Sequence, residues 1–143
     1  TDAPKTSLGV WVKGQEDTCY ICNFYKDTYA RYLDTFFELF KKSQEFLPLF
    51  ETCKGFCIPH FGDLVETAES ALSDKEKKAF YAILFPMMEQ NMQRLSDDLD
   101  WFCDKFDYRN KDADWRTSKD ALPRGMQKAA GGYPADEPYT MDK

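Results

Sequence analysis

Two close pairs of residues in this 143-residue sequence carry side chains that commonly bind metal ions. The first pair, Cys19 and Cys22, forms a C-x2-C motif, and the second pair, Cys57 and His60, forms a C-x2-H motif. Three thiolates and one imidazole complete the tetrahedral shell of a structural zinc ion. Thiolates also hold iron–sulfur clusters, so an iron–sulfur cluster at the same residues is the alternative. The spacing therefore predicts a metal site, with zinc as the expected cofactor.

Two further cysteines, Cys53 and Cys103, complete the set of five. Cys53 precedes Cys57 by four residues and could replace His60 as a ligand. Because Cys57 and His60 share one turn, we interpret Cys53 instead as a small apolar side chain at the end of a helix. Cys103 follows Leu99 by four positions on the expected inner face of a long helix, which predicts a position in the core.

If these four residues bind a metal, the sequence offers few other side chains for a catalytic centre. His60 is the only histidine, so a role in metal binding leaves no imidazole base for a cysteine nucleophile. A redox centre of the thioredoxin type would follow a strand, and haem attachment would need a histidine where Asn23 stands. A complete set of four ligands also leaves no open coordination position. The sequence therefore favours a protein that is not an enzyme.

Charge and hydropathy narrow the class of partner. The chain has 25 acidic and 19 basic residues, a formal net charge of -6, and no dense run of Lys or Arg, which argues against nucleic acid. No apolar stretch is long enough to cross a membrane, and residues 1–10 lack the basic start and apolar run of a signal peptide. Cysteine pairs at ligand spacing are typical of a reducing compartment. We therefore expect a cytoplasmic protein that binds neither nucleic acid nor membrane.

The periodicity of the apolar residues predicts an all-α fold. Apolar side chains recur every three or four positions, and no useful stretch alternates as a strand would. Four helices are predicted, at about 19–42, 43–53, 57–72 and 73–106. Each ligand pair then lies at a helix N-terminus, where free N–H groups and the helix dipole stabilise a thiolate. The prediction is an irregular four-helix bundle with a metal site at two helix N-termini.

Local signals support these boundaries. Ser73 and Glu76 have the spacing of a capping box, Gly55 is suited to a left-handed exit from a helix, and Pro86 should kink the fourth helix. Two rows of side chains are expected to face the core: Tyr25, Tyr29 and Tyr32 in the first helix, and Tyr81, Leu84, Phe85, Met88, Met92, Leu95, Leu99, Phe102 and Phe106 in the fourth.

Composition divides the chain into three parts. Residues 1–17 are expected to form a lead-in strap that docks Trp11 on the core, 18–109 the metal-binding helical bundle, and 110–143 an extended tail with a short helix at about 118–130.

Spaced apolar residues in the tail predict that it docks. Trp115, Leu122 and Tyr133 stand apart in an otherwise polar stretch and are expected to pack on the bundle or on a partner. Arg124 is then expected to meet the acidic run at 97–100, which we interpret as a solvated face.

Several segments carry a family resemblance: TSLGVW at 6–11, CYIC at 19–22, YARYLDTFF at 29–37, GFCIPHF at 55–61, KDAL at 119–122 and GGYP at 131–134. Over nearly its whole length the chain resembles an uncharacterised bacterial family described only as a domain of unknown function. Members of that family carry the C-x2-C and G-F-C-x2-H elements twice per polypeptide, so the resemblance implies that this chain is similar to the carboxy-terminal copy. It also implies that Cys19, Cys22, Cys57 and His60 are the motif positions. It implies no role for Cys53 and no reaction.

Together these observations predict a zinc-stabilised helical module that acts by interaction. The expected partner is a protein, including an upstream copy of the same motif. The alternative is an iron–sulfur or zinc–thiolate domain of a redox enzyme or metalloenzyme.

Overall fold

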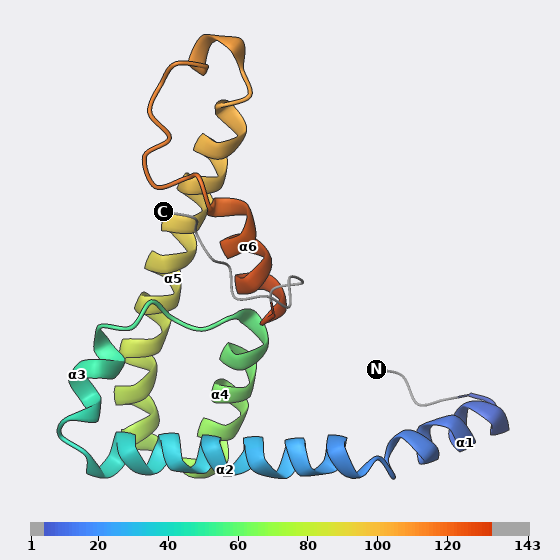
Figure 1. Cartoon of the computed structure of the whole chain (residues 1–143). Coiled ribbons are helices and arrows are strands. Elements are labelled where there is room, and N and C mark those ends of the chain that lie inside the picture. Colours follow the sequence, from blue (N-terminus) through green and yellow to red (C-terminus); the bar gives the residue numbers. More distant parts are fainter. Residues whose placement is uncertain (1–4, 133–143) are drawn as a thin grey trace. The chain divides into compact units, whose positions relative to one another are not determined.

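The structure is a computed structural model that describes residues 5–132, and its regular elements are helical throughout that range. The helices are α1 (Ser7–Glu16), α2 (Tyr20–Lys42), α3 (Phe46–Glu51), α4 (Ile58–Ala71), α5 (Asp74–Asp104), a 3-10 turn (Tyr108–Asn110) and α6 (Ala121–Ala130) (Figure 1). No strand occurs among the described residues, which confirms the all-α fold class.

The contacts divide the chain into two units, Thr1–Lys42 and Ser43–Lys143. Unit 1 holds α1 and α2, and unit 2 holds the remaining helices. The expected four-helix bundle stays a prediction, because its first helix belongs to unit 1 and the other three belong to unit 2. The division at residues 17 and 109 likewise stays a prediction.

The lead-in segment of unit 1 is a helix where the sequence analysis expected a strap. Thr6 is its N-cap, and the Thr6 hydroxyl accepts a hydrogen bond from the Gly9 N–H at 3.1 Å. Trp11, which was expected to dock, is 62% exposed. The chain then turns, with the Thr18 hydroxyl donating to the Gln15 carbonyl at 2.8 Å, and α2 begins directly after Cys19.

The aromatic row on α2 is exposed. Tyr25 and Tyr29 stack along the helix with ring centroids 6.3 Å apart, and Tyr20 and Phe24 do the same at 6.3 Å. The prediction of a core position is wrong for Tyr25 and Tyr32, which are 66% and 69% exposed.

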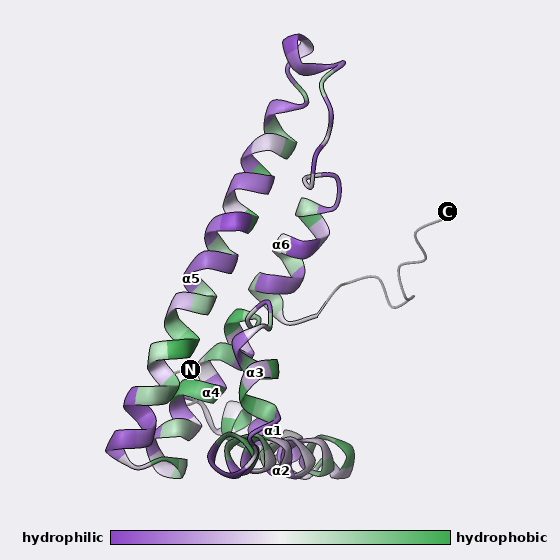
Figure 2. Cartoon of the chain, turned by 90° about the vertical axis from the view of Figure 1, so that its left-hand side faces the viewer, coloured by the Kyte–Doolittle hydropathy of each residue, from purple (hydrophilic) through white to green (hydrophobic). Residues whose placement is uncertain are grey.

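Unit 2 is organised around α5. Helices α3 and α6 both contact α5, and α6 also contacts α4. Phe50 of α3 stacks on Phe80 of α5 with ring centroids 5.5 Å apart, and apolar residues concentrate where these helices meet (Figure 2). The buried apolar residues of unit 2 are Phe50, Leu64, Ala68, Leu72, Phe80, Leu84, Met87, Met88, Leu95 and Ala121.

The start of α5 and the loop before α4 follow the sequence signals. The Glu76 carboxylate accepts the Ser73 N–H at 2.8 Å, which confirms the expected capping box. Gly55 has a φ of 71°, the left-handed conformation expected of it. Helix α5 continues unbroken through Pro86.

The inner face of α5 is only partly the predicted one. Leu84, Met88 and Leu95 are buried as expected, whereas three expected core residues are exposed: Phe85, Met92 and Phe106. The core position predicted for Cys103 is also wrong, because this residue is exposed. The neighbouring helices lie along different parts of α5, so no single stripe is covered over its whole length (Figure 1).

A buried lysine organises the loop after α5. Lys105 is 8% exposed, and its Nζ donates hydrogen bonds to the main-chain carbonyls of Asn110, Lys111 and Ala113. The ammonium group also lies 5.2 Å from the centroid of the Trp115 ring. These contacts replace the water that a charged side chain would otherwise require.

The segment after this loop docks as predicted, with two corrections. Trp115 lies 5.8 Å from Phe102, and Arg124 pairs with Asp98 at 3.0 Å. Asp98 is 8% exposed, so it does not belong to a solvated face, and Leu122 is 50% exposed and is no anchor. The third expected anchor, Tyr133, lies outside the described residues.

Candidate metal centre

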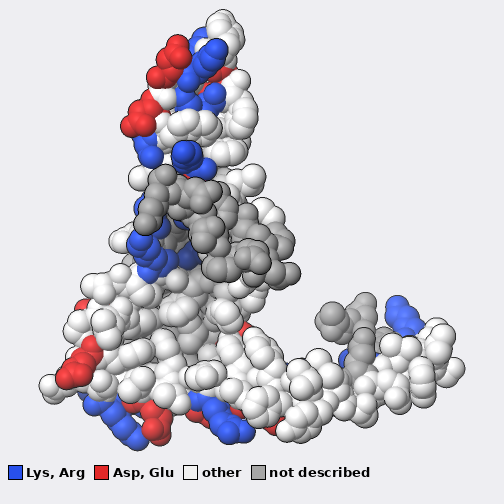
Figure 3. All heavy atoms as spheres, viewed as in Figure 1, with Lys and Arg blue, Asp and Glu red and all other residues white. Residues whose placement is uncertain are grey.

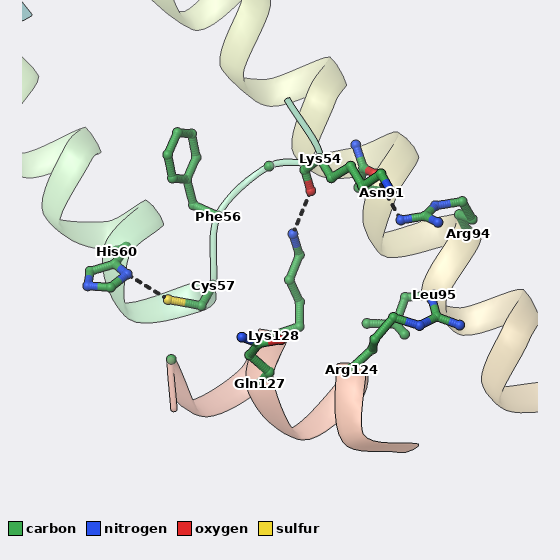
Figure 4. A pocket seen from close by; sticks show the side chains of 12 residues that line it. Lys54, Phe56, Cys57, His60, Asn91, Arg94, Leu95, Arg124, Gln127 and Lys128 are labelled. Carbon is green, nitrogen blue, oxygen red and sulfur yellow. Dashed lines mark hydrogen bonds between the residues drawn. The ribbon is translucent and has the colours of Figure 1, made fainter. Parts of the chain in front are cut away.

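Cys57 and His60 lie together at the start of α4. Cys57 is the N-cap, with an extended backbone, and its carbonyl accepts the Phe61 N–H at 2.8 Å. Pro59 occupies the first turn, where a missing N–H is tolerated. This local geometry directs both side chains to the same side, and Cys57 Sγ lies 3.0 Å from His60 Nδ1 (Figure 4).

The Cys57–His60 geometry is close to that of two ligands on one zinc ion. Bond lengths of about 2.3 Å to sulfur and about 2.1 Å to nitrogen, at a tetrahedral angle, separate the two ligand atoms by about 3.6 Å. The observed distance of 3.0 Å is shorter and fits a direct hydrogen bond. A small rotation of the exposed His60 side chain would open the separation that a metal requires.

Cys19 and Cys22 stand at the start of α2 in the same relation. Cys19 directly precedes the helix, and its carbonyl accepts the Asn23 N–H at 3.0 Å. Hydrogen bonds from the Cys22 backbone and side chain hold the pKa of Cys19 below its usual value. Both thiols are exposed, so an incoming metal ion could reach them.

The structure places each predicted pair at a helix start, as the sequence analysis expected. Cys19 and Cys22 belong to unit 1, and Cys57 and His60 belong to unit 2. Within the described part of each unit, no further Cys, His or carboxylate joins a pair to make a group of three. Cys53 is half-buried, with its Sγ 3.2 Å from Met87 Sδ, in keeping with its interpretation as a small apolar side chain.

A cavity of about 490 Å³ lies beside Cys57 and His60, within unit 2 (Figure 4). It is bounded by the loop before α4, by α5 and by the last turns of α6. Its lining residues are Lys54, Gly55, Phe56, Cys57, His60, Asn91, Arg94, Leu95, Arg124, Gln127, Lys128 and Gly131.

Lys128 of α6 and Gly131, the residue that follows this helix, lie against this region, and sequence reasoning missed both. Lys128 Nζ donates a hydrogen bond to the Lys54 carbonyl at 3.1 Å. Burial lowers the pKa of Lys128, although the nearby Cys53 and Cys57 act in the opposite direction and raise it. Gly131 ends α6 with a φ of 78°, and a Cβ at this position would lie 3.1 Å from Cys57 Sγ. The GGYP segment, which contains Gly131, was the one signal that could have directed attention to it.

Comparison with known proteins identifies the family of the chain but gives no activity or ligand. None of the helices in residues 5–132 combines the length and apolar character needed to cross a membrane. No curated protein and no solved structure matches the chain. The model of one family, described as a family of unknown function, matches residues 1–136. The chain therefore belongs to this family, DUF6062.

Proposed function

We propose that the protein is a zinc-stabilised helical interaction module in which Cys19, Cys22, Cys57 and His60 bind one zinc ion. The observation that carries the proposal is the approach of Cys57 Sγ to His60 Nδ1, at 3.0 Å. The N-terminus of α4 already brings together two of the four ligands, and the start of α2 carries the second pair. Zinc would join the two helix starts, and its binding free energy would add to the free energy of folding.

The N-terminal positions of the ligands support a structural metal. Three thiolates and one neutral imidazole give zinc a formal charge of -1, and free N–H groups in the first turn of a helix offset such charge. Cysteine pairs at the spacing of metal ligands, such as Cys19 and Cys22, are typical of proteins in a reducing compartment. The proposal therefore places the protein in the cytoplasm, and its net charge of -6 does not favour nucleic acid.

The exposed apolar side chains of unit 1 support the interaction part of the proposal. Eight large apolar side chains of this unit are at least half exposed, three on α1 and five on α2: Leu8, Val10, Trp11, Tyr20, Ile21, Phe24, Tyr25 and Tyr32. Apolar surface of this extent is typical of an interface. We propose an upstream copy of the same motif as its partner, in line with the duplicated motifs of the family that the sequence resembles.

Protein purified under aerobic conditions should contain about one zinc ion per chain, the stoichiometry of a four-ligand site. Elemental analysis by plasma mass spectrometry measures this content, and thiol titration measures the free cysteines. Protein without metal, or with a disulfide between Cys19 and Cys22, would contradict the zinc site. A brown, oxygen-labile protein containing iron would support the iron–sulfur alternative instead.

The purified chain should also self-associate, because a second copy of it can bind the surface that we propose for the upstream copy. Phe24→Glu places a charge at the centre of that surface and should weaken the dimer by about tenfold or more. Sedimentation equilibrium of the wild type and the variant measures the dimer constant. Lys26→Glu, at an exposed polar position on α2, is the matched control and should leave it within about twofold. A wild-type chain that stays monomeric would rule out this partner surface.

A further inference from the structure

The cavity beside Cys57 is lined by positive charge. Four cations border it: Lys54 from the loop before α4, Arg94 from α5, and Arg124 and Lys128 from α6. Several Lys and Arg side chains are visible together over the middle of α5 (Figure 3). This concentration is unexpected in a chain with a net charge of -6. Such a concentration of positive charge attracts a counter-charge, either from the protein or from outside it.

Among the described residues, only one of these cations forms an ion pair with a carboxylate. Arg124 pairs with Asp98 at 3.0 Å and with Asp120 at 2.9 Å. No ion pair among the described residues includes the other three cations. Lys128 Nζ binds the neutral Lys54 carbonyl, and Arg94 binds the neutral Asn91 amide oxygen at 3.3 Å. In residues 5–132, three positive charges therefore border one cavity without forming an ion pair with a carboxylate.

The remaining lining suits a small organic molecule. Phe56 and Leu95 provide apolar surface, whereas Asn91 and Gln127 provide amide groups that can form hydrogen bonds. A volume of about 490 Å³ falls within the usual range of ligand pockets. The Lys128 head group lies close to Gly55, because a Cβ on Gly55 would be only 3.2 Å from Lys128 Nζ. Glycine at residue 55 leaves room for the lysine head group at the edge of the cavity.

We propose that this cavity binds a small organic oxyanion with a charge of about -2, such as a phosphate ester or a dicarboxylate, through Lys54, Arg94 and Lys128. The guanidinium of Arg94 can form two parallel hydrogen bonds with such a group, and the two ammonium groups add point charges. Phe56 and Leu95 contact the organic part. None of the three cations is a proposed zinc ligand, so an experiment can disprove one of the two sites without disproving the other.

Phenyl phosphate combines a dianion with an apolar ring and is the first probe. Calorimetric titration of the full chain at low salt should show saturable binding at one site per chain, weakened by added sodium chloride. Phthalate, a dicarboxylate with the same ring, is titrated in the same way: tighter binding of phthalate identifies a dicarboxylate ligand, and tighter binding of phenyl phosphate identifies a phosphate ester. Phenol, which lacks the charge, should not bind.

Charge-removing variants test whether this cavity is the site. Arg94→Gln and Lys128→Met should each weaken binding about tenfold, the usual effect of losing one charge-assisted hydrogen bond. Lys54→Met should weaken binding as well, and because the side chain is exposed its replacement should have little effect on stability. Lys78→Met, at an exposed position of α5 outside the cavity, is the matched control.

The chain's own acidic residues Asp136, Glu137 and Asp142, which lie outside the described residues, could compete for the same cations. Each titration is therefore repeated in the full-length D136N/E137Q/D142N background. Saturable binding in either background, weakened by the cavity variants, supports the site. No saturable binding of either probe in both backgrounds, or equal affinity in all three cavity variants and the control, would overturn it.

Discussion

Cys57→Ser protein should contain almost no zinc, and its melting temperature should fall by roughly 10 °C. A structural zinc ion is bound strongly only by its complete ligand set, and the loss of one thiolate releases it. A metal present at a thousandfold excess over its Kd stabilises the folded state by about 4 kcal/mol. For a chain of this size, each kcal/mol corresponds to roughly 2–4 °C. Elemental analysis and differential scanning calorimetry of the same sample measure both effects.

The remaining cysteines provide matched controls. Cys103 is exposed and Cys53 is half-buried, so Cys103→Ser should change nothing and Cys53→Ser should have only a mild effect. Cys22→Ser and His60→Ala should behave like Cys57→Ser. If Cys53→Ser released zinc as completely as Cys57→Ser, the assigned ligand set would be wrong. If every variant kept the wild-type melting temperature, zinc would have no structural role.

Asp98→Ala should lower the free energy of unfolding by about 3 kcal/mol, the usual cost of breaking a buried ion pair by removing one partner. Asp98 accepts a hydrogen bond from the Thr117 hydroxyl at 2.6 Å and pairs with Arg124 at 3.0 Å. Arg124 in turn donates to the Thr117 carbonyl at 2.6 Å. Removing the carboxylate leaves the Thr117 hydroxyl without its acceptor and Arg124 without its buried partner on α5, which loosens α6 from α5. Urea denaturation monitored by circular dichroism measures the loss.

Asp97 provides the control because it is the exposed neighbour of Asp98 and accepts only from Gln93, at 2.8 Å. Asp97→Ala should change the free energy of unfolding by less than about 0.5 kcal/mol. Equal effects of the two substitutions would show that the Asp98 pair does not hold α6 in place.

The same pair should make stability depend on pH. Burial alone would raise the pKa of Asp98, but the donors on Thr117 and Arg124 outweigh it and hold the pKa below its usual value. Ionised Asp98 therefore stabilises the folded state above the unfolded-state pKa of about 3.9, and this contribution is lost as the pH falls through the folded-state pKa. The difference in unfolding free energy between wild type and Asp98→Asn should accordingly shrink below about pH 4. A difference that stays constant to pH 3 would contradict this.

The long helices could be predicted because their signals are local. The capping box of Ser73 and Glu76 and the apolar period of α5 depend only on residues a few positions apart. Helix α1 was missed because Gly9 and Gly14 lower helix propensity, whereas the Thr6 cap stabilises the first turn of that helix. Glycine at these positions weakens a helix without forbidding it.

The candidate site could be predicted only in part, for a related reason. The spacing of Cys57 and His60 is a local feature, and the start of α4 brings the two side chains together. The approach of Lys128 to Lys54 joins residues 74 positions apart and depends on where α6 packs. Tertiary packing also explains the burial of Asp98, because its partners Thr117 and Arg124 come from a later segment. No periodic pattern along α5 distinguishes Asp98 from its acidic neighbours.

The hydrogen bonds from Lys105 to the following loop determine which substitutions related proteins can accept there. Its three acceptors, in Asn110, Lys111 and Ala113, are main-chain carbonyls, which every amino acid possesses. The loop can therefore accept many substitutions at these positions and still be held, provided that its backbone path is kept. Replacement of Lys105 itself would release all three contacts at once. We expect related proteins to retain this lysine, whereas the amino acids at its three acceptor positions should vary.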